Sequence, residues 1–192
     1  ISLDHVSFSY EDAAGKALDD VSLDVPEGTI TALVGESGGG KSTVANLIAR
    51  FWDVDEGVIR VGGVDVREMD YKYWMEQVSI VFQDTNLFKM SIMENVAVFN
   101  PDASREDVLQ ALHLAQCDDI LEKLPQGADT VIGTKGIYLS GGEMQRIALA
   151  RAILKNAPVV LLDEATAFAD AENEYLIQKA LDELLRGKTV IM

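Results

Sequence analysis

The chain has 192 residues, of which 48% are hydrophobic and 25% are charged. This is an ordinary globular composition, and it excludes collagen-like, low-complexity and disordered chains. Lys and Arg number 16 against 32 Asp and Glu, which gives a formal net charge of −16. Because so acidic a surface repels a phosphate backbone, we expect no nucleic acid among the partners.

The length favours a single domain, at about 150 residues per domain. The single cysteine, Cys117, cannot form an internal disulfide, which fits a reducing compartment. The longest apolar run, 157–162, is far shorter than the roughly 20 residues that span a bilayer, and no secretion signal precedes it. Strand-like patterns at both ends, 3–10 and 189–192, indicate a fragment of a longer polypeptide. We therefore expect a soluble domain that faces the cytosol.

The first half of the chain alternates strand and helix patterns. Residues 3–10 alternate apolar and polar side chains, and the β-rich run 29–34 leads into a glycine-rich segment. An apolar stripe with helical spacing follows and ends at Phe51. Two β-rich runs joined by a two-glycine turn predict a hairpin over 58–66, and the run 78–82 predicts a short buried strand.

The second half is mostly helical. Capping-box spacing predicts helix starts at Ser91 and Ser104. The apolar run 159–162 is typical of a strand buried in a parallel sheet, and a last helix is expected over 171–186. Alternating strands and helices with a helical block over 84–150 predict an α/β sheet that carries a helical insertion.

A phosphate-binding loop is the strongest motif. Residues 35–42 read GESGGGKS and fit G-x-x-x-x-G-K-[ST], with a strand pattern before and a helix pattern after. Glycines let backbone N–H groups turn inward around phosphate oxygens, Lys41 supplies a charge for the β- and γ-phosphates, and the Ser42 hydroxyl can bind Mg²⁺. A glycine turn that only caps a helix is the alternative. The residues expected to hold the nucleotide are Gly35, Glu36, Ser37, Gly38, Gly39, Gly40, Lys41, Ser42 and Thr43.

Two acids, Asp163 and Glu164, follow the apolar strand 159–162. Ligands of open α/β sheets bind at the carboxyl ends of strands, so this position suits a site. Successive strand residues point in opposite directions, so we assign the two acids different roles. Asp163 is expected to bind Mg²⁺ and Glu164 to activate the attacking water as general base.

A second anion-binding helix end is expected at Ser140. Ser140 and Glu143 have capping-box spacing, which is a purely structural explanation for those two residues. It does not explain Gly141 and Gly142, because glycine is a poor helix former. A glycine pair suits a backbone that closely approaches a phosphate, either in the same molecule or in a second one.

The three motifs GESGGGKS, LSGGE and VVLLDE resemble those of the ATP-binding cassette (ABC) ATPases, and the resemblance covers nearly the whole chain. It implies a P-loop NTPase core of about 1–83 and 151–192 with a mainly parallel sheet and an N-terminal antiparallel β subdomain. The inserted helical subdomain would span about 84–150. Glu143 departs from the family pattern, in which glutamine is usual.

The resemblance also assigns roles to single residues. Tyr10 matches the aromatic residue that stacks on adenine, and Gln83 matches the glutamine that meets Mg²⁺ and the attacking water. Asp170 matches the aspartate that couples two protomers. The expected catalytic residues are therefore Glu164, Gln83 and Lys41. A further active-site histidine of the family would follow Met192, so we expect this piece alone to hydrolyse ATP weakly or not at all.

The function implied is that of an exporter-type transporter ATPase, with ATP and Mg²⁺ as cofactors. Two such domains would close head to tail around ATP, and Ser140, Gly141 and Gly142 would touch the partner's nucleotide. The other partner would be a transmembrane domain, which places the chain at the cytoplasmic face of a membrane. The alternatives are a soluble ABC ATPase, which coiled-coil insertions or basic patches would mark, and a non-hydrolysing switch, against which Glu164 argues.

Overall fold

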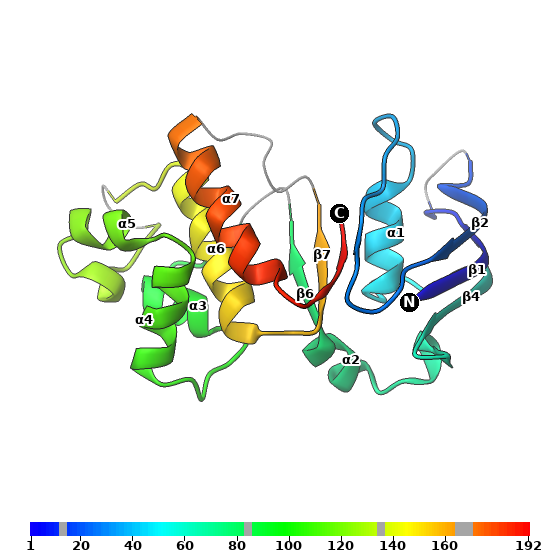
Figure 1. The fold of residues 1–192 in the computed structure, drawn as a ribbon, viewed down its shortest axis with the longest axis horizontal. Coiled ribbons are helices and arrows are strands. Elements are labelled where there is room, and N and C mark those ends of the chain that lie inside the picture. Colours follow the sequence, from blue (N-terminus) through cyan, green and yellow to red (C-terminus); the bar gives the residue numbers. More distant parts are fainter. Residues whose placement is uncertain (12–14, 83–85, 134–136, 164–170) are drawn as a thin grey trace. The chain divides into compact units, whose positions relative to one another are not determined.

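The structure, a computed structural model, describes residues 1–11, 15–82, 86–133, 137–163 and 171–192 (Figure 1). These residues pack into two compact units. Unit 1 comprises 1–79, 158–163 and 187–192, and unit 2 the described residues of 80–157 and 164–186. The units reflect packing alone, so the division into a core and a helical insertion stays a prediction.

Two four-stranded sheets organise the strands, with the orders β2-β1-β4-β5 and β3-β8-β7-β6. The first sheet is antiparallel and consists of β1 (Ser2–Phe8), β2 (Leu18–Asp24), β4 (Glu56–Val61) and β5 (Val64–Asp65). The second contains β3 (Ile30–Thr31), β6 (Val78–Val81), β7 (Val159–Leu162) and β8 (Thr189–Ile191). In the second sheet β3 and β7 both pair with β8 in parallel, and Val160 lies opposite Val190. An α/β fold with a parallel sheet is confirmed.

Strand β1 is irregular, and its irregularity allows both Leu3 and Val6 to be buried. Leu3 and Val6 are both buried although a spacing of three would turn them to opposite faces in a regular strand. The register shifts between them, and His5 lies there with a φ of 50°. Such a bulge turns Val6 back toward the interior. The predicted hairpin is confirmed, with Gly62 and Gly63 both at positive φ in its turn.

Helix α1 (Lys41–Ile48) follows the phosphate loop in unit 1. The sequence stripe extended to Phe51, but the helix ends earlier because Arg50 takes a left-handed φ of 60°. The buried indole of Trp74 donates to the Ile48 carbonyl at 2.9 Å and holds this end. The 3-10 turn η1 (Val66–Glu68) and helix α2 (Tyr71–Gln77) complete the unit.

The described part of unit 2 is mainly helical, and α6 packs against α3, α4 and α7 (Figure 1). The capping boxes predicted at Ser91 with Glu94 and at Ser104 with Asp107 are present. The helices are α3 (Ile92–Ala97), α4 (Arg105–Leu114), α5 (Asp118–Lys123), α6 (Gly141–Lys155) and α7 (Ala171–Leu185), with the 3-10 turn η2 (Gly127–Asp129).

Candidate functional site

The phosphate loop has the backbone that its glycines permit. Gly38 and Gly40 have φ angles of 79° and 83°, which L side chains rarely adopt. A Cβ on Gly40 would lie 2.6 Å from Leu18 Cδ2 and 2.8 Å from the Ala17 carbonyl oxygen. Only glycine therefore fits at Gly40, whereas the loop 35–39 itself is exposed. The loop is accessible to a ligand.

Lys41 and the start of α1 form the positive end of this loop. The ammonium of Lys41 donates to the carbonyls of Gly35 and Glu36 at 3.0 and 2.8 Å, so it lies against the loop. In the described part of the chain, no side chain caps the N-terminus of α1 at Gly40. First-turn amides without a side-chain cap suit an anion, and the helix dipole favours it further.

Ser42 and Asp163 meet inside unit 1. Ser42 is in the first turn of α1 and Asp163 follows β7, and the Ser42 hydroxyl donates to Asp163 Oδ1 at 2.7 Å. The pair offers two oxygen ligands of the kind that Mg²⁺ prefers, beside a loop suited to phosphate. The described residues contain no cluster of three or more His, Cys, Asp or Glu side chains for a metal. Mg²⁺ at this position would take its remaining ligands from phosphate and water, as is usual for Mg²⁺ in proteins.

Tyr10 lies beside the phosphate-loop helix. Its hydroxyl is 3.2 Å from Thr43 Oγ1, and its ring packs edge-on against Phe8 at 4.9 Å and Trp52 at 5.3 Å. These edge contacts hold the ring, which is part-exposed. Trp52 belongs to this aromatic group although the sequence patterns assigned it no role. No sequence motif includes Trp52, so its place in this group becomes visible only in the folded unit.

The second predicted helix end lies in unit 2. Ser140 caps α6, its hydroxyl accepts from the Glu143 amide at 3.2 Å, and the Glu143 carboxylate accepts from the Ser140 amide at 2.8 Å. The capping box is therefore present, and it is the local reason why α6 begins here.

The two glycines of this helix end differ in their surroundings. A Cβ on Gly142 would lie 2.6 Å from Asn173 Cγ, so close packing against α7 already accounts for a glycine there. A Cβ on Gly141 would meet no described atom within 4 Å. Gly141 is exposed, so a role in packing does not account for it. Packing thus explains the glycine at position 142, whereas the predicted approach to a phosphate is still needed to explain the glycine at position 141.

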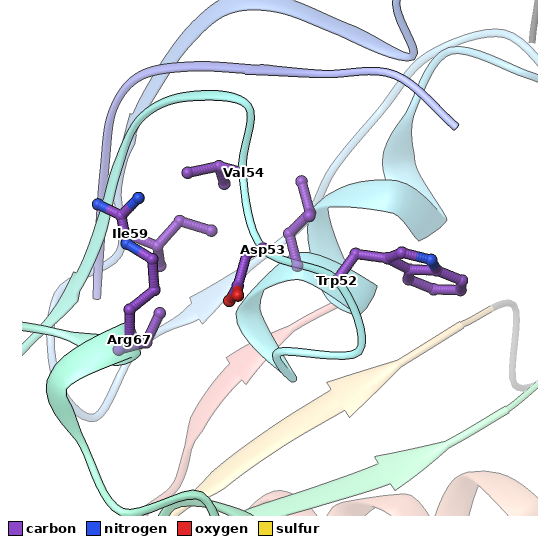
Figure 2. A pocket seen from close by; sticks show the side chains of 7 residues that line it. Trp52, Asp53, Val54, Ile59 and Arg67 are labelled. Carbon is purple, nitrogen blue, oxygen red and sulfur yellow. The ribbon is translucent and has the colours of Figure 1, made fainter. Parts of the chain in front are cut away.

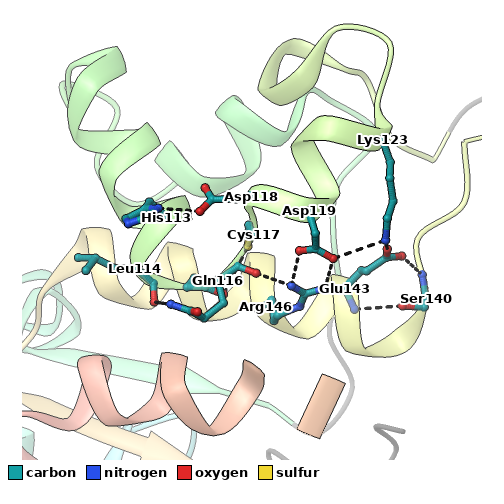
Figure 3. Close-up of polar contacts among 11 residues, drawn as sticks. His113, Leu114, Gln116, Cys117, Asp118, Asp119, Lys123, Ser140, Glu143 and Arg146 are labelled. Carbon is teal, nitrogen blue, oxygen red and sulfur yellow. Dashed lines mark hydrogen bonds and ion pairs between the residues drawn. The ribbon is translucent and has the colours of Figure 1, made fainter. Parts of the chain in front are cut away.

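An ion-pair network joins α5 to α6 next to this helix end (Figure 3). The Arg146 side chain is only 1% exposed and donates to both carboxylate oxygens of Asp119, at 2.6 and 3.1 Å, and to the Gln116 carbonyl. The hydrogen bond from Arg146 holds the pKa of Asp119 below its usual range. Burial raises the pKa of the neighbouring Cys117 thiol to about 12, so the thiol is neutral. This network was not predicted from the sequence, although an arginine within an otherwise apolar helix face was a signal.

A pocket lies in unit 1, between the end of α1 and the hairpin (Figure 2). Leu47, Trp52, Asp53, Val54, Ile59, Val66 and Arg67 line it. Its lining is mainly apolar and includes no residue expected to bind the nucleotide. The pocket thus shares no residue with the predicted phosphate loop.

Three predicted site residues, Gln83, Glu164 and Asp170, lie outside the described residues. The other predicted residues divide between the units. Tyr10, the phosphate loop and Asp163 belong to unit 1, and Ser140 with its glycines belongs to unit 2.

Comparison with known proteins gives matches over most or all of the chain. A family model described as "ABC transporter" matches residues 18–167. An ATP-dependent lipid A-core flippase from Vibrio vulnificus (strain YJ016) is 48% identical over 193 residues, which cover 100% of this chain and 33% of that protein. A mycobactin import ATP-binding/permease protein from Mycolicibacterium smegmatis is 50% identical over 192 residues, covering 100% of this chain and 22% of that protein.

A solved structure is similar as well. It is described as a bacterial Atm1-family ABC exporter with ATP bound, and it superimposes with a TM-score of 0.90 at 39% identity. The match covers 99% of this chain and 33% of that chain. The chain thus spans about a third or less of these relatives. Among the described residues, no helix is both long and apolar enough to cross a membrane.

Proposed function

Because the chain belongs to the ABC transporter family, we propose that it is the ATP-binding and ATP-hydrolysing domain of a membrane transporter of the exporter type. The family predicted from the three sequence motifs is confirmed. The observation that carries the proposal is the 2.7 Å hydrogen bond between Ser42 and Asp163, which joins the phosphate loop to the acid at the end of β7. The ATP-bound state of the structural relative supports ATP as the ligand.

In the proposed mechanism, residues of unit 1 bind the triphosphate. The loop amides of 35–40 surround the phosphates, and Lys41 turns from the two loop carbonyls to the β- and γ-phosphate oxygens. Ser42 and Asp163 would hold Mg²⁺, which neutralises phosphate charge when bound. Tyr10 would contact the adenine, where base–aromatic stacking contributes about 1–3 kcal/mol.

Hydrolysis would depend on positioning and charge neutralisation around an in-line attack. We assign the general base to Glu164, the placement of the attacking water to Gln83, and the coupling between protomers to Asp170. Ser140 and Gly141 would complete the site on the nucleotide of a second copy or a related domain. We further propose a transmembrane domain as the mechanical partner, with the ATPase at the cytoplasmic face.

The test is Glu164→Gln in the full-length protein that carries this chain. The amide cannot accept the proton, so phosphate release should fall by about 10²–10⁴-fold. ATP should then hold a dimer that gel filtration resolves. Glu174→Gln, at an exposed position of α7, is the matched control and should retain turnover. Unchanged turnover of Glu164→Gln would remove Glu164 from the role of base.

A further inference from the structure

The acidic residue in the first turn of α6 has a cationic neighbour. Lys123, the last residue of α5, places its ammonium 3.7 Å from Glu143 Oε1 and 3.5 Å from Asp119 Oδ2 (Figure 3). Glu143 directly follows Gly141 and Gly142 in the first turn of α6. The first turn of α6 thus carries a negative charge at Glu143.

The two oxygens of Glu143 have different partners. Oε2 accepts from the Ser140 amide at 2.8 Å and completes the capping box. Oε1 is left to face Lys123. The Glu143 side chain is only 18% exposed, so solvent screens its charge incompletely. The positive end of the helix dipole stabilises a carboxylate in the first helical turn. The same carboxylate repels a triphosphate that binds at this helix end.

Lys123 belongs to α5, and α5 is joined to α6 by the buried guanidinium of Arg146. Arg146 spans both oxygens of Asp119 and is 1% exposed. The Nε of Arg146 has no hydrogen-bond partner among the described residues. The guanidinium is therefore held by Asp119 and the Gln116 carbonyl. This anchor keeps the end of α5, and with it Lys123, beside Glu143.

We propose that Lys123 is a positioning residue for ATP-dependent closure, which compensates the Glu143 carboxylate at the nucleotide-facing end of α6. This inference rests on the proposed function, because it assumes that a partner's triphosphate binds at Ser140 and Gly141. Lys123 touches no reacting atom. It acts through Glu143 by lowering the negative potential that the triphosphate meets, and by keeping the carboxylate in its capping geometry.

The magnitude is that of one partly exposed charge pair. The Lys123 side chain is 66% exposed, so we expect its loss to raise the ATP concentration for half-maximal turnover by about two- to fivefold. The kcat should change less, since Lys123 is not in contact with the reacting phosphate. The defect should shrink between 50 and 500 mM salt, where the Debye length falls from about 14 Å to about 4 Å.

The experiment is a double-mutant cycle in the full-length protein with Mg²⁺-ATP. The variants are Lys123→Met, Lys123→Arg, Glu143→Gln and the combination of Lys123→Met with Glu143→Gln. ATP titrations give KM and kcat, gel filtration gives ATP-dependent self-association, and melting without nucleotide reports folding. Lys72→Met, at an exposed position of α2, is the control for loss of a surface charge.

The proposal requires that Lys123→Met raises the ATP requirement, that Lys123→Arg restores it, and that Lys123→Met has no effect once Glu143→Gln is present. An equal effect in both backgrounds, or no effect in either, overturns it. A separate arm with Lys41→Ala tests the proposed function: a persisting ATP response there would refute nucleotide binding at the loop. A failure of the Lys123 arm alone leaves that function standing.

Discussion

Gly142→Ala and Gly141→Ala are adjacent substitutions in one helical turn for which the structure predicts opposite effects on stability. In a helix, alanine is normally favoured over glycine by about 0.5–1 kcal/mol. At Gly142 a Cβ would lie 2.6 and 2.7 Å from Asn173 Cγ and Cβ, and overpacking of this kind costs about 1–3 kcal/mol. We therefore expect Gly142→Ala to lower the free energy of unfolding by about 1–2 kcal/mol. Gly141→Ala should raise it by about 0.5 kcal/mol, because its Cβ meets nothing.

Thermal and urea unfolding of the chain measure both effects. For a chain of this length a change of 1 kcal/mol shifts the melting temperature by about 2–4 °C. The Gly142→Ala penalty should vanish when Asn173→Gly removes the clashing atoms. Equal stability of the two variants, or a penalty that survives Asn173→Gly, would refute the packing argument. If Gly141 also contacts a partner's phosphate, Gly141→Ala should weaken ATP-dependent self-association despite its unimpaired stability.

Two further predictions concern stability. Asp119→Asn should cost about 2 kcal/mol at neutral pH, since it leaves the Arg146 charge buried without its counterion while Asp119 itself stays part-exposed. Because the pKa of Asp119 is lowered in the folded chain, this advantage of the parent chain should be constant above about pH 5. It should be lost as the pH falls below about 4 in an unfolding series from pH 7 to 2. Gly40→Ala should cost about 2–4 kcal/mol in urea unfolding, from its positive φ and the clash with Leu18, whereas Gly15→Ala, in open space, should change stability little.

Local sequence patterns predicted the helix starts and the hairpin turn, because these features depend on residues close together in the chain. The capping boxes at Ser91 and Ser104 and the two-glycine hairpin turn are confirmed, since a helix start and a tight turn are decided within four residues. The β-rich run 29–34 became only the two-residue strand β3, although the Leu33 amide still donates to the Met192 carbonyl at 2.6 Å. Pairing with a segment about 160 residues away sets the length of that strand, and no local pattern encodes it.

The candidate site was predictable where a motif carried it. The phosphate loop and Asp163 were named from the sequence, and their contact through Ser42 is present. The reason for Gly142 could not be predicted, because Asn173 lies about 30 residues further along the chain and approaches only in the folded unit. The same holds for Arg146 with Asp119 and for Lys123 with Glu143, which are pairs formed by helix packing.

The central claim is that residues 35–42 bind the triphosphate, and nucleotide-dependent melting of the chain tests it most directly. With Mg²⁺-ATP at 100 times its Kd, binding should stabilise the chain by about 2.7 kcal/mol, a rise in Tm of about 5–10 °C. Lys41→Ala removes two exposed hydrogen bonds to loop carbonyls, so its nucleotide-free Tm should stay within a few degrees of the parent while the ATP-dependent rise disappears. An undiminished rise in Lys41→Ala would contradict the account.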